Sequence, residues 1–174
     1  MTTQADAYTI RAARFYAGPG KVPVPDDIPV FDAIEAAREF MGSEYEQGMV
    51  FTPPVFQSLW RAYTGETGFD IAIAGTVGIG TWLVAYTNDG SPPAGFAVLG
   101  SYPSGDQPDL RIRLQHLYVR PEHRRRGLAR RLVETAVRCG AVLVEKPFTA
   151  ESEPLIAQFP QLEPVWSPGW SPGR

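Results

Sequence analysis

The chain has 174 residues, enough for one domain with a hydrophobic core. Apolar residues make up 44% and charged residues 20%, which is ordinary globular usage and excludes disorder of the whole chain. The formal net charge is −3, so a generally basic, nucleic-acid-binding surface is not expected.

The charges are unevenly distributed along the chain. Nine of the fourteen arginines lie between Arg111 and Arg138, and seven acidic residues lie between Asp26 and Glu46. One concentrated basic segment in an acidic protein indicates a local anion site. The acidic segment is interpreted as a solvated face, with attraction of an amine substrate as the alternative.

Three features predict a cytoplasmic location. Residues 1–6 lack a basic region followed by an apolar run, so no secretion signal is predicted. The apolar stretch Phe69–Tyr86 contains Asp70 and several glycines, which argues against a membrane span. The single cysteine, Cys139, excludes an internal disulfide and is expected in the core, with a reactive thiol as the alternative.

The N-terminal part is predicted to form a strand, a loop and two helices. Tyr8–Arg14 is a short strand, and Ala17–Pro29 is a loop rich in glycine and proline. Apolar residues at helical spacing predict a helix over Val30–Met41. A second helix is expected to begin at Thr52 as its N-cap and to end at Gly65.

The middle of the chain is predicted to form strands. Phe69–Ala74, Thr81–Thr87 and Ala94–Tyr102 are short and rich in aromatic and branched residues. Asn88-Asp89-Gly90 predicts a β-hairpin between the last two strands. A loop is expected over Pro103–Asp109.

The strand Leu110–Val119 shows a change of phase. Its apolar alternation runs to Leu114 and resumes one residue late at Leu117. A strand with one buried face needs an extra residue for such a step, so a β-bulge is predicted near Gln115 and His116. Alternatively, both faces are buried and the phase carries little information.

An amphipathic helix follows and begins directly after a run of arginines. Apolar residues recur at helical spacing from Leu128 to Cys139, and Gly140 ends the helix. Ala141–Glu145 is predicted to be a buried strand, and Ser152 to cap a last short helix. The unpaired N–H groups at the helix start attract anions, and Gly127 allows close approach of the backbone.

The sequence at this turn resembles a known family. Arg124-x-x-Gly127-x-Ala129 matches the Q/R-x-x-G-x-G/A motif of the GNAT superfamily of N-acetyltransferases. The resemblance covers Thr81–Phe159 well and Tyr8–Tyr63 loosely. It implies an α/β (α+β) fold whose mixed, mostly antiparallel sheet has flanking helices and a bulged fourth strand. One domain is expected over 1–163, with a tail over 164–174.

The resemblance implies an N-acetyltransferase that uses acetyl-CoA and needs no metal. A primary amine, on a small molecule or a peptide, would attack the thioester directly, and the thiolate would leave. The implied cofactor-binding residues are Leu117, Tyr118, Val119, Arg124, Arg125, Arg126, Gly127, Leu128, Ala129 and Arg130. The alternatives for the arginine run are a solvated segment and a nucleic-acid contact.

The catalytic residues are less clearly indicated. The family often places Glu or His before the bulge, but here Arg113 and Gln115 occupy those positions, and neither accepts a proton at neutral pH. His116 is the first candidate base, with a hydrogen-bonded strand histidine as the alternative, and Glu145 is the second. Phe159 stands at the usual position of a tyrosine that protonates the thiolate.

The C-terminal end is shorter than the family pattern, which has two more strands. The sheet is therefore expected to end at Ala141–Glu145 unless a second copy, a protein partner or another part of the chain covers the edge. Trp166 and Trp170 are candidates for this cover, and a disordered tail is the alternative. These departures support a second hypothesis, a catalytically weak GNAT module that binds coenzyme A or assembles with other proteins.

Overall fold

The computed structural model describes residues 7–14, 22–32, 54–67, 81–104, 107–146 and 148–166. Their strands form one sheet in the order β2-β1-β3-β4-β5-β6-β7. The strands are β1 (Tyr8–Arg14), β2 (Val30–Asp32), β3 (Thr81–Thr87), β4 (Gly95–Ser104), β5 (Gln107–Val119), β6 (Ala141–Lys146) and β7 (Glu163–Trp166). The helices are α3 (Pro54–Thr67), α5 (Leu128–Arg138) and α6 (Glu153–Ile156), with a 3-10 turn at Pro121–His123.

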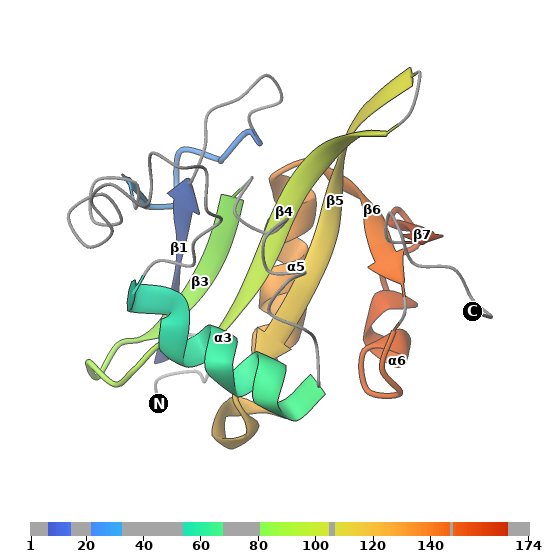
Figure 1. The fold of residues 1–174 in the computed structure, drawn as a ribbon. Helices are drawn as coiled ribbons and strands as arrows, with labels where there is room; N and C mark the ends of the chain where they lie inside the picture. The colour runs from blue at the N-terminus through green and yellow to red at the C-terminus, as the bar shows by residue number, and fades with distance from the viewer. Residues whose placement is uncertain are drawn as a thin grey trace.

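The sheet is mixed, as expected. The long central strands β1, β3, β4 and β5 pair antiparallel, whereas the short pairings β1·β2, β5·β6 and β6·β7 at its two sides are parallel. Helix α3 lies across one face and α5 lies against the other (Figure 1). The sheet therefore has a hydrophobic core on each face, and the predicted mixed α/β fold is confirmed.

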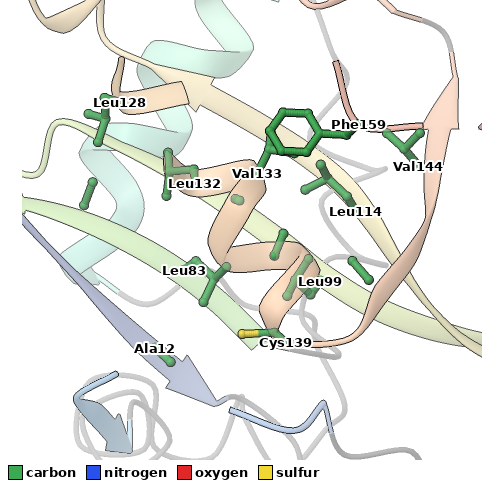
Figure 2. Packing of buried hydrophobic residues seen from close by; sticks show 14 of the residues in the cluster. Ala12, Leu83, Leu99, Leu114, Leu128, Leu132, Val133, Cys139, Val144 and Phe159 are labelled. Carbon is green, nitrogen blue, oxygen red and sulfur yellow. The ribbon is translucent and has the colours of Figure 1, made fainter. Parts of the chain in front are cut away.

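The larger core lies under α5. Leu128, Leu132, Ala136 and Cys139 from one stripe of the helix are almost fully buried against the sheet (Figure 2). We call this group, with its strand partners, the α5-face cluster. Each fully buried leucine contributes about 1.5–3 kcal/mol. The prediction that Cys139 is a core residue is confirmed.

The smaller core lies under α3. Its buried members, which we call the α3-face cluster, are Ala13, Leu59, Tyr63, Trp82, Val84, Phe96, Val98 and Tyr118. Along β3, Trp82 and Val84 belong to this cluster, whereas Leu83 and Ala85 belong to the α5-face cluster. This alternation shows that the middle of the sheet is covered on both faces.

The predicted bulge in β5 is confirmed. Val98 pairs with His116 and Leu99 pairs with Leu114, so Gln115 is the extra residue. Leu114 and Leu117 both contact the α5-face cluster although they are three residues apart. The inserted residue restores the apolar side chains to the core face, as the phase change in the sequence indicated.

Two predictions in the N-terminal half are wrong. Val30–Asp32 is not helical but forms β2, because this β-branched and aromatic segment pairs in parallel with Ala12–Arg14. Helix α3 continues through Gly65 to Thr67, because one glycine inside a helix costs only about 1 kcal/mol relative to alanine. The rest of the helix predicted over 30–41, the strand predicted over 69–74 and the N-cap at 52 lie outside the described residues.

The predicted loop over Pro103–Asp109 is largely strand. Pro103 pairs with Pro108 and Ser104 pairs with Gln107, so β4 and β5 continue as a long hairpin (Figure 1). A proline is tolerated in an antiparallel ladder where its nitrogen faces away from the partner strand. The two prolines therefore do not break the ladder, and the loop prediction is wrong.

The expectation that the sheet ends at Ala141–Glu145 is also wrong. After α6 the chain turns back, with Phe159 and Leu162 buried in the α5-face cluster. The next residues, Glu163–Trp166, pair in parallel with Leu143–Lys146. Pro164 fits there because an edge strand can omit one N–H donor. Another part of the chain thus covers the edge of β6.

Candidate functional site

The turn between β5 and α5 has an unusual backbone. Arg125 has a φ of +60° and Gly127 a φ of +76°, both in the left-handed region. Left-handed residues within a tight turn direct successive N–H groups to one side and form an anion-binding concavity. A Cβ at Gly127 would meet nothing within 4 Å, so the backbone conformation, not crowding, favours glycine there.

The N–H groups of this turn are available to a ligand. The first backbone hydrogen bond of α5 runs from the Arg131 N–H to the Gly127 carbonyl, at 3.1 Å. Across the described ranges, none of the N–H groups of residues 125–130 donates to a backbone carbonyl. Because these donors coincide with the positive end of the helix dipole, the predicted turn fits a diphosphate.

The arginines of the turn differ in their contacts with other side chains. Arg125 and Arg126 are exposed, and neither forms an ion pair within the part of the chain that the structure describes. Arg130 is bonded through Nε to Glu134, at 2.9 Å, and through Nη1 to Gln158, at 3.2 Å. Arg125 and Arg126 are therefore the side chains best placed to meet an incoming anion.

Arg124 instead turns towards α3. Its Nη2 lies 2.5 Å from Oε1 of Glu66, and its Nε donates to the Val119 carbonyl at 2.9 Å. The Tyr118 hydroxyl donates to Oε2 of Glu66 at 3.1 Å, and the Arg124 guanidinium lies 5.8 Å from the Tyr118 ring centroid. The hydrogen bond from Arg124 is the main cause that lowers the pKa of Glu66. We call these four residues the Glu66 clamp.

Strands β5 and β6 part at the bulge. Their parallel pairing ends at Leu114 and Val144, although β5 continues to Val119 paired with β4, and β6 continues to Lys146 paired with β7. The five residues 115–119 span about 16 Å at the rise of a strand. Residues 115–119 run from the turn to the bulge. An extended thioester arm that starts at the turn could therefore lie beside them.

The other predicted binding residues border this stretch. Tyr118 is buried in the α3-face cluster, whereas Leu117, Val119 and Leu128 contact the α5-face cluster. Ala129 packs against the latter cluster too, so the first turn of α5 sits close to the sheet. The Val119 carbonyl already accepts a hydrogen bond from Arg124.

His116 contacts α3 through a hydrogen bond. Its Nδ1 lies 2.8 Å from the Tyr63 hydroxyl, and the two rings meet edge to face at 5.5 Å. Burial lowers the pKa of His116 to about 4 and raises the pKa of Tyr63. At neutral pH the imidazole is thus uncharged and the phenol keeps its proton.

The remaining two predicted catalytic positions lie on either side of the sheet. Glu145 is partly buried and follows Val144, whose side chain is in the α5-face cluster. By the alternation of a strand, Glu145 is on the α3 face, the face on which His116 meets Tyr63. Phe159 is buried in the α5-face cluster, close to Leu114, Val133 and Val144 (Figure 2).

Two residues of this site were missed by sequence reasoning. Tyr63 lies within the helix predicted to end at Gly65 but was given no role in the site, and Glu66 was not considered. Leu59, Tyr63 and Glu66 recur at helical spacing i, i+4 and i+7, so they share one face of α3. A carboxylate one turn beyond buried Leu59 and Tyr63 on the same helix face was the signal that could have indicated the clamp.

Within the described ranges, no three His, Cys, Asp or Glu side chains lie close enough together to hold a metal ion. No helix in those ranges is both long and apolar enough to cross a lipid bilayer.

The central segment is similar to a known protein family. Residues 78–157 match the family model described as an acetyltransferase (GNAT) domain, which confirms the resemblance found in the sequence and supports acetyl-group transfer. No curated protein is detectably similar to the chain.

Among solved structures, a nourseothricin acetyltransferase is 35% identical over 36% of each chain, with a TM-score of 0.26. An aminoglycoside acetyltransferase from an uncultured soil metagenomic sample is 19% identical over 88% of each chain, with a TM-score of 0.39. A GCN5-related N-acetyltransferase from Ralstonia eutropha JMP134 is 19% identical over 95% of this chain and 93% of that chain, with a TM-score of 0.38.

Proposed function

We propose that the chain transfers an acetyl group from acetyl-CoA to a primary amine in a ternary complex, because residues 78–157 match the family model of a GNAT acetyltransferase domain. The observation that carries the proposal is the turn at 125–130. Its N–H groups are not used by backbone carbonyls within the described ranges, and two of its residues have positive φ values. Such a turn suits a diphosphate.

The binding roles follow from the positions of the residues. The N–H groups of residues 125–130 hold the diphosphate, and Arg125 and Arg126 add positive charge at its rim. The backbone of Leu117–Val119 runs beside the thioester arm where β5 has left β6. Acetyl-CoA supplies an activated acyl group, so the chain has to position it and to manage the proton of the amine.

The transfer forms a C–N bond and breaks the C–S bond of the thioester. An amine with an ordinary pKa near 10.4 is protonated at neutral pH and must lose a proton before it attacks. His116 and Glu145, on the two strands that part at the bulge, are the proposed acceptors. His116 stays neutral, but a pKa of about 4 makes it a weak base, and Tyr63 engages its Nδ1. Both residues therefore stay candidates for proton removal, and the proposal does not depend on which of them acts.

The test is calorimetric titration with acetyl-CoA of the wild-type protein, Gly127→Ala and Gly90→Ala. Both glycines have a positive φ, +76° and +80°, and at both a Cβ would meet nothing within 4 Å. The two variants therefore suffer similar backbone strain, but Gly90 lies in the β3–β4 hairpin, away from the turn. We expect only Gly127→Ala to lose affinity. Absence of binding by the wild-type protein, or equal binding by all three, would exclude the proposal.

A second function is favoured by Phe159, a ring without a hydroxyl at the position of the usual proton donor. In this second function the chain is a GNAT module that binds coenzyme A and assembles with other proteins, without efficient turnover. Thiol release from acetyl-CoA, measured against a panel of primary amines, separates the two functions. Turnover with any amine supports the transferase, and binding without turnover supports the module.

A further inference from the structure

We propose that Glu66 is a positioning residue for the diphosphate-binding turn and that it acts through Arg124. The inference rests on the proposed binding of acetyl-CoA at that turn. Glu66 lies on α3, more than fifty residues before the turn in the sequence, and the structure brings its carboxylate to the first residue of the turn at 2.5 Å. It would touch Arg124 and Tyr118, not the ligand.

The backbone of the turn is strained at Arg125. Arg125 is not a glycine, yet it has a φ of +60°. A side chain makes that conformation unfavourable, and it persists only where neighbouring groups hold the backbone. The peptide unit that precedes this residue belongs to Arg124, so whatever fixes Arg124 also fixes the direction of the first N–H group of the concavity.

Arg124 is fixed at three points. Its backbone N–H bonds the Pro121 carbonyl at 3.2 Å, its Nε bonds the Val119 carbonyl at 2.9 Å, and its Nη2 meets Glu66. The first bond lies within the loop, and the second runs to the last residue of β5. The third ties the loop to α3, which lies on the opposite face of the sheet from α5 (Figure 1). Glu66 is therefore one external support of the loop, beside Ser58, which accepts a hydrogen bond from Arg120, and Tyr8, whose hydroxyl contacts His123.

Both carboxylate oxygens of Glu66 serve this arrangement. Oε1 accepts from Arg124 and Oε2 accepts from the Tyr118 hydroxyl, so the carboxylate joins the turn to the end of β5. A competing role for Arg124 is a direct contact with the diphosphate. In that case Glu66 would hold a useful cation away from the ligand, and its removal would strengthen binding. The two roles thus predict opposite changes in the Kd of acetyl-CoA when Glu66 is replaced.

The experiment is a double-mutant cycle on acetyl-CoA binding, measured by calorimetric titration of the wild-type protein, Glu66→Gln, Arg124→Gln and the double variant. We expect Glu66→Gln to raise the Kd roughly three- to fivefold, the range of an exposed ion pair. In the Arg124→Gln background the same change should have no further effect. Equal or tighter binding by Glu66→Gln, or effects that simply add, would overturn the proposal.

Two further variants complete the design. Asp27→Asn removes another 2.5 Å carboxylate–arginine pair, to Arg138 at the far end of α5, and should leave the Kd unchanged. Tyr118→Phe removes one hydrogen bond to Glu66 and should weaken binding in the same direction, even if Glu66→Gln does not fold. If the wild-type protein itself fails to bind acetyl-CoA, the proposed function fails, whereas wild-type binding with an unchanged Glu66→Gln variant refutes only this inference.

Discussion

The hydroxyl group of Tyr63 lies 2.8 Å from Nδ1 of His116, so a side chain of α3 holds the imidazole beside the bulge of β5. The pair lies among aromatic rings, with the Tyr63 ring centroid 5.6 Å from those of Phe96 and Tyr118. In these surroundings a charged imidazolium is poorly solvated, which lowers the pKa of His116 to about 4.

The first prediction follows from this pKa. An unfolded histidine has a pKa near 6.5, so between pH 6.5 and 4 the unfolded state binds more protons than the folded state. Stability should therefore fall as the pH falls through this window, by at most about 3 kcal/mol from this residue, and level off below it. Urea unfolding at a series of pH values measures the fall, and His116→Gln should flatten it. An unchanged profile in that variant would assign the fall to other groups.

The second prediction concerns the two exposed arginines of the turn. If Arg125 and Arg126 meet the diphosphate, changing both to glutamine should raise the Kd of acetyl-CoA about tenfold, because two charge-assisted contacts are lost. The remaining affinity should also depend less on salt, since fewer charges are screened. Titrations at low and high ionic strength measure both effects. Arg138→Gln, at the other end of α5, is the control and should retain wild-type affinity and salt dependence.

The third prediction concerns Gln115, the extra residue of the bulge. Its side chain is 9% exposed, and its Oε1 has no hydrogen-bond partner in the described part of the chain. A buried acceptor without a partner costs free energy that an apolar group of similar shape does not. Gln115→Met should therefore raise the free energy of unfolding by about 1 kcal/mol, measured with urea. Gln158→Met removes a glutamine whose side chain is exposed and hydrogen-bonded, and should give no gain. A loss of stability in Gln115→Met would contradict the prediction and would indicate that a bound water satisfies Oε1 of Gln115.

The features that could be predicted from the sequence are those that residues close together in the chain determine. The bulge was visible because Leu114 and Leu117 are on one face but three residues apart. The anion-binding turn was visible because strand, arginines, Gly127 and amphipathic helix follow one another without interruption. In both cases the physical cause lies within about ten residues, where periodicity and backbone preference are decisive.

The features that could not be predicted join distant segments. The Tyr63–His116 bond spans 53 residues and the Arg124–Glu66 pair spans 58. Neither helical nor strand periodicity reports which side chains meet across the sheet. Strand β7 was missed for a related reason. Its four residues include Pro164 and show no strong pattern, and they form a strand because the edge of β6 offers a partner.

The last prediction asks whether the missing hydroxyl at residue 159 limits turnover. Phe159 is 6% exposed and packs close to Leu114 and Val144, the last pair before β5 and β6 separate (Figure 2). Phe159→Tyr should place a proton donor where the thioester arm is proposed to end. We expect kcat to rise at least tenfold at neutral pH, because a positioned acid typically contributes more than that. Steady-state thiol release with the best amine of the panel measures kcat, and thermal unfolding reports the cost of the added hydroxyl.

Phe159→Leu, which has no proton to give, should lower stability without raising kcat. An unchanged kcat together with a lower Tm in Phe159→Tyr would place the hydroxyl in the core, away from the reacting sulfur, and would leave solvent as the proton source.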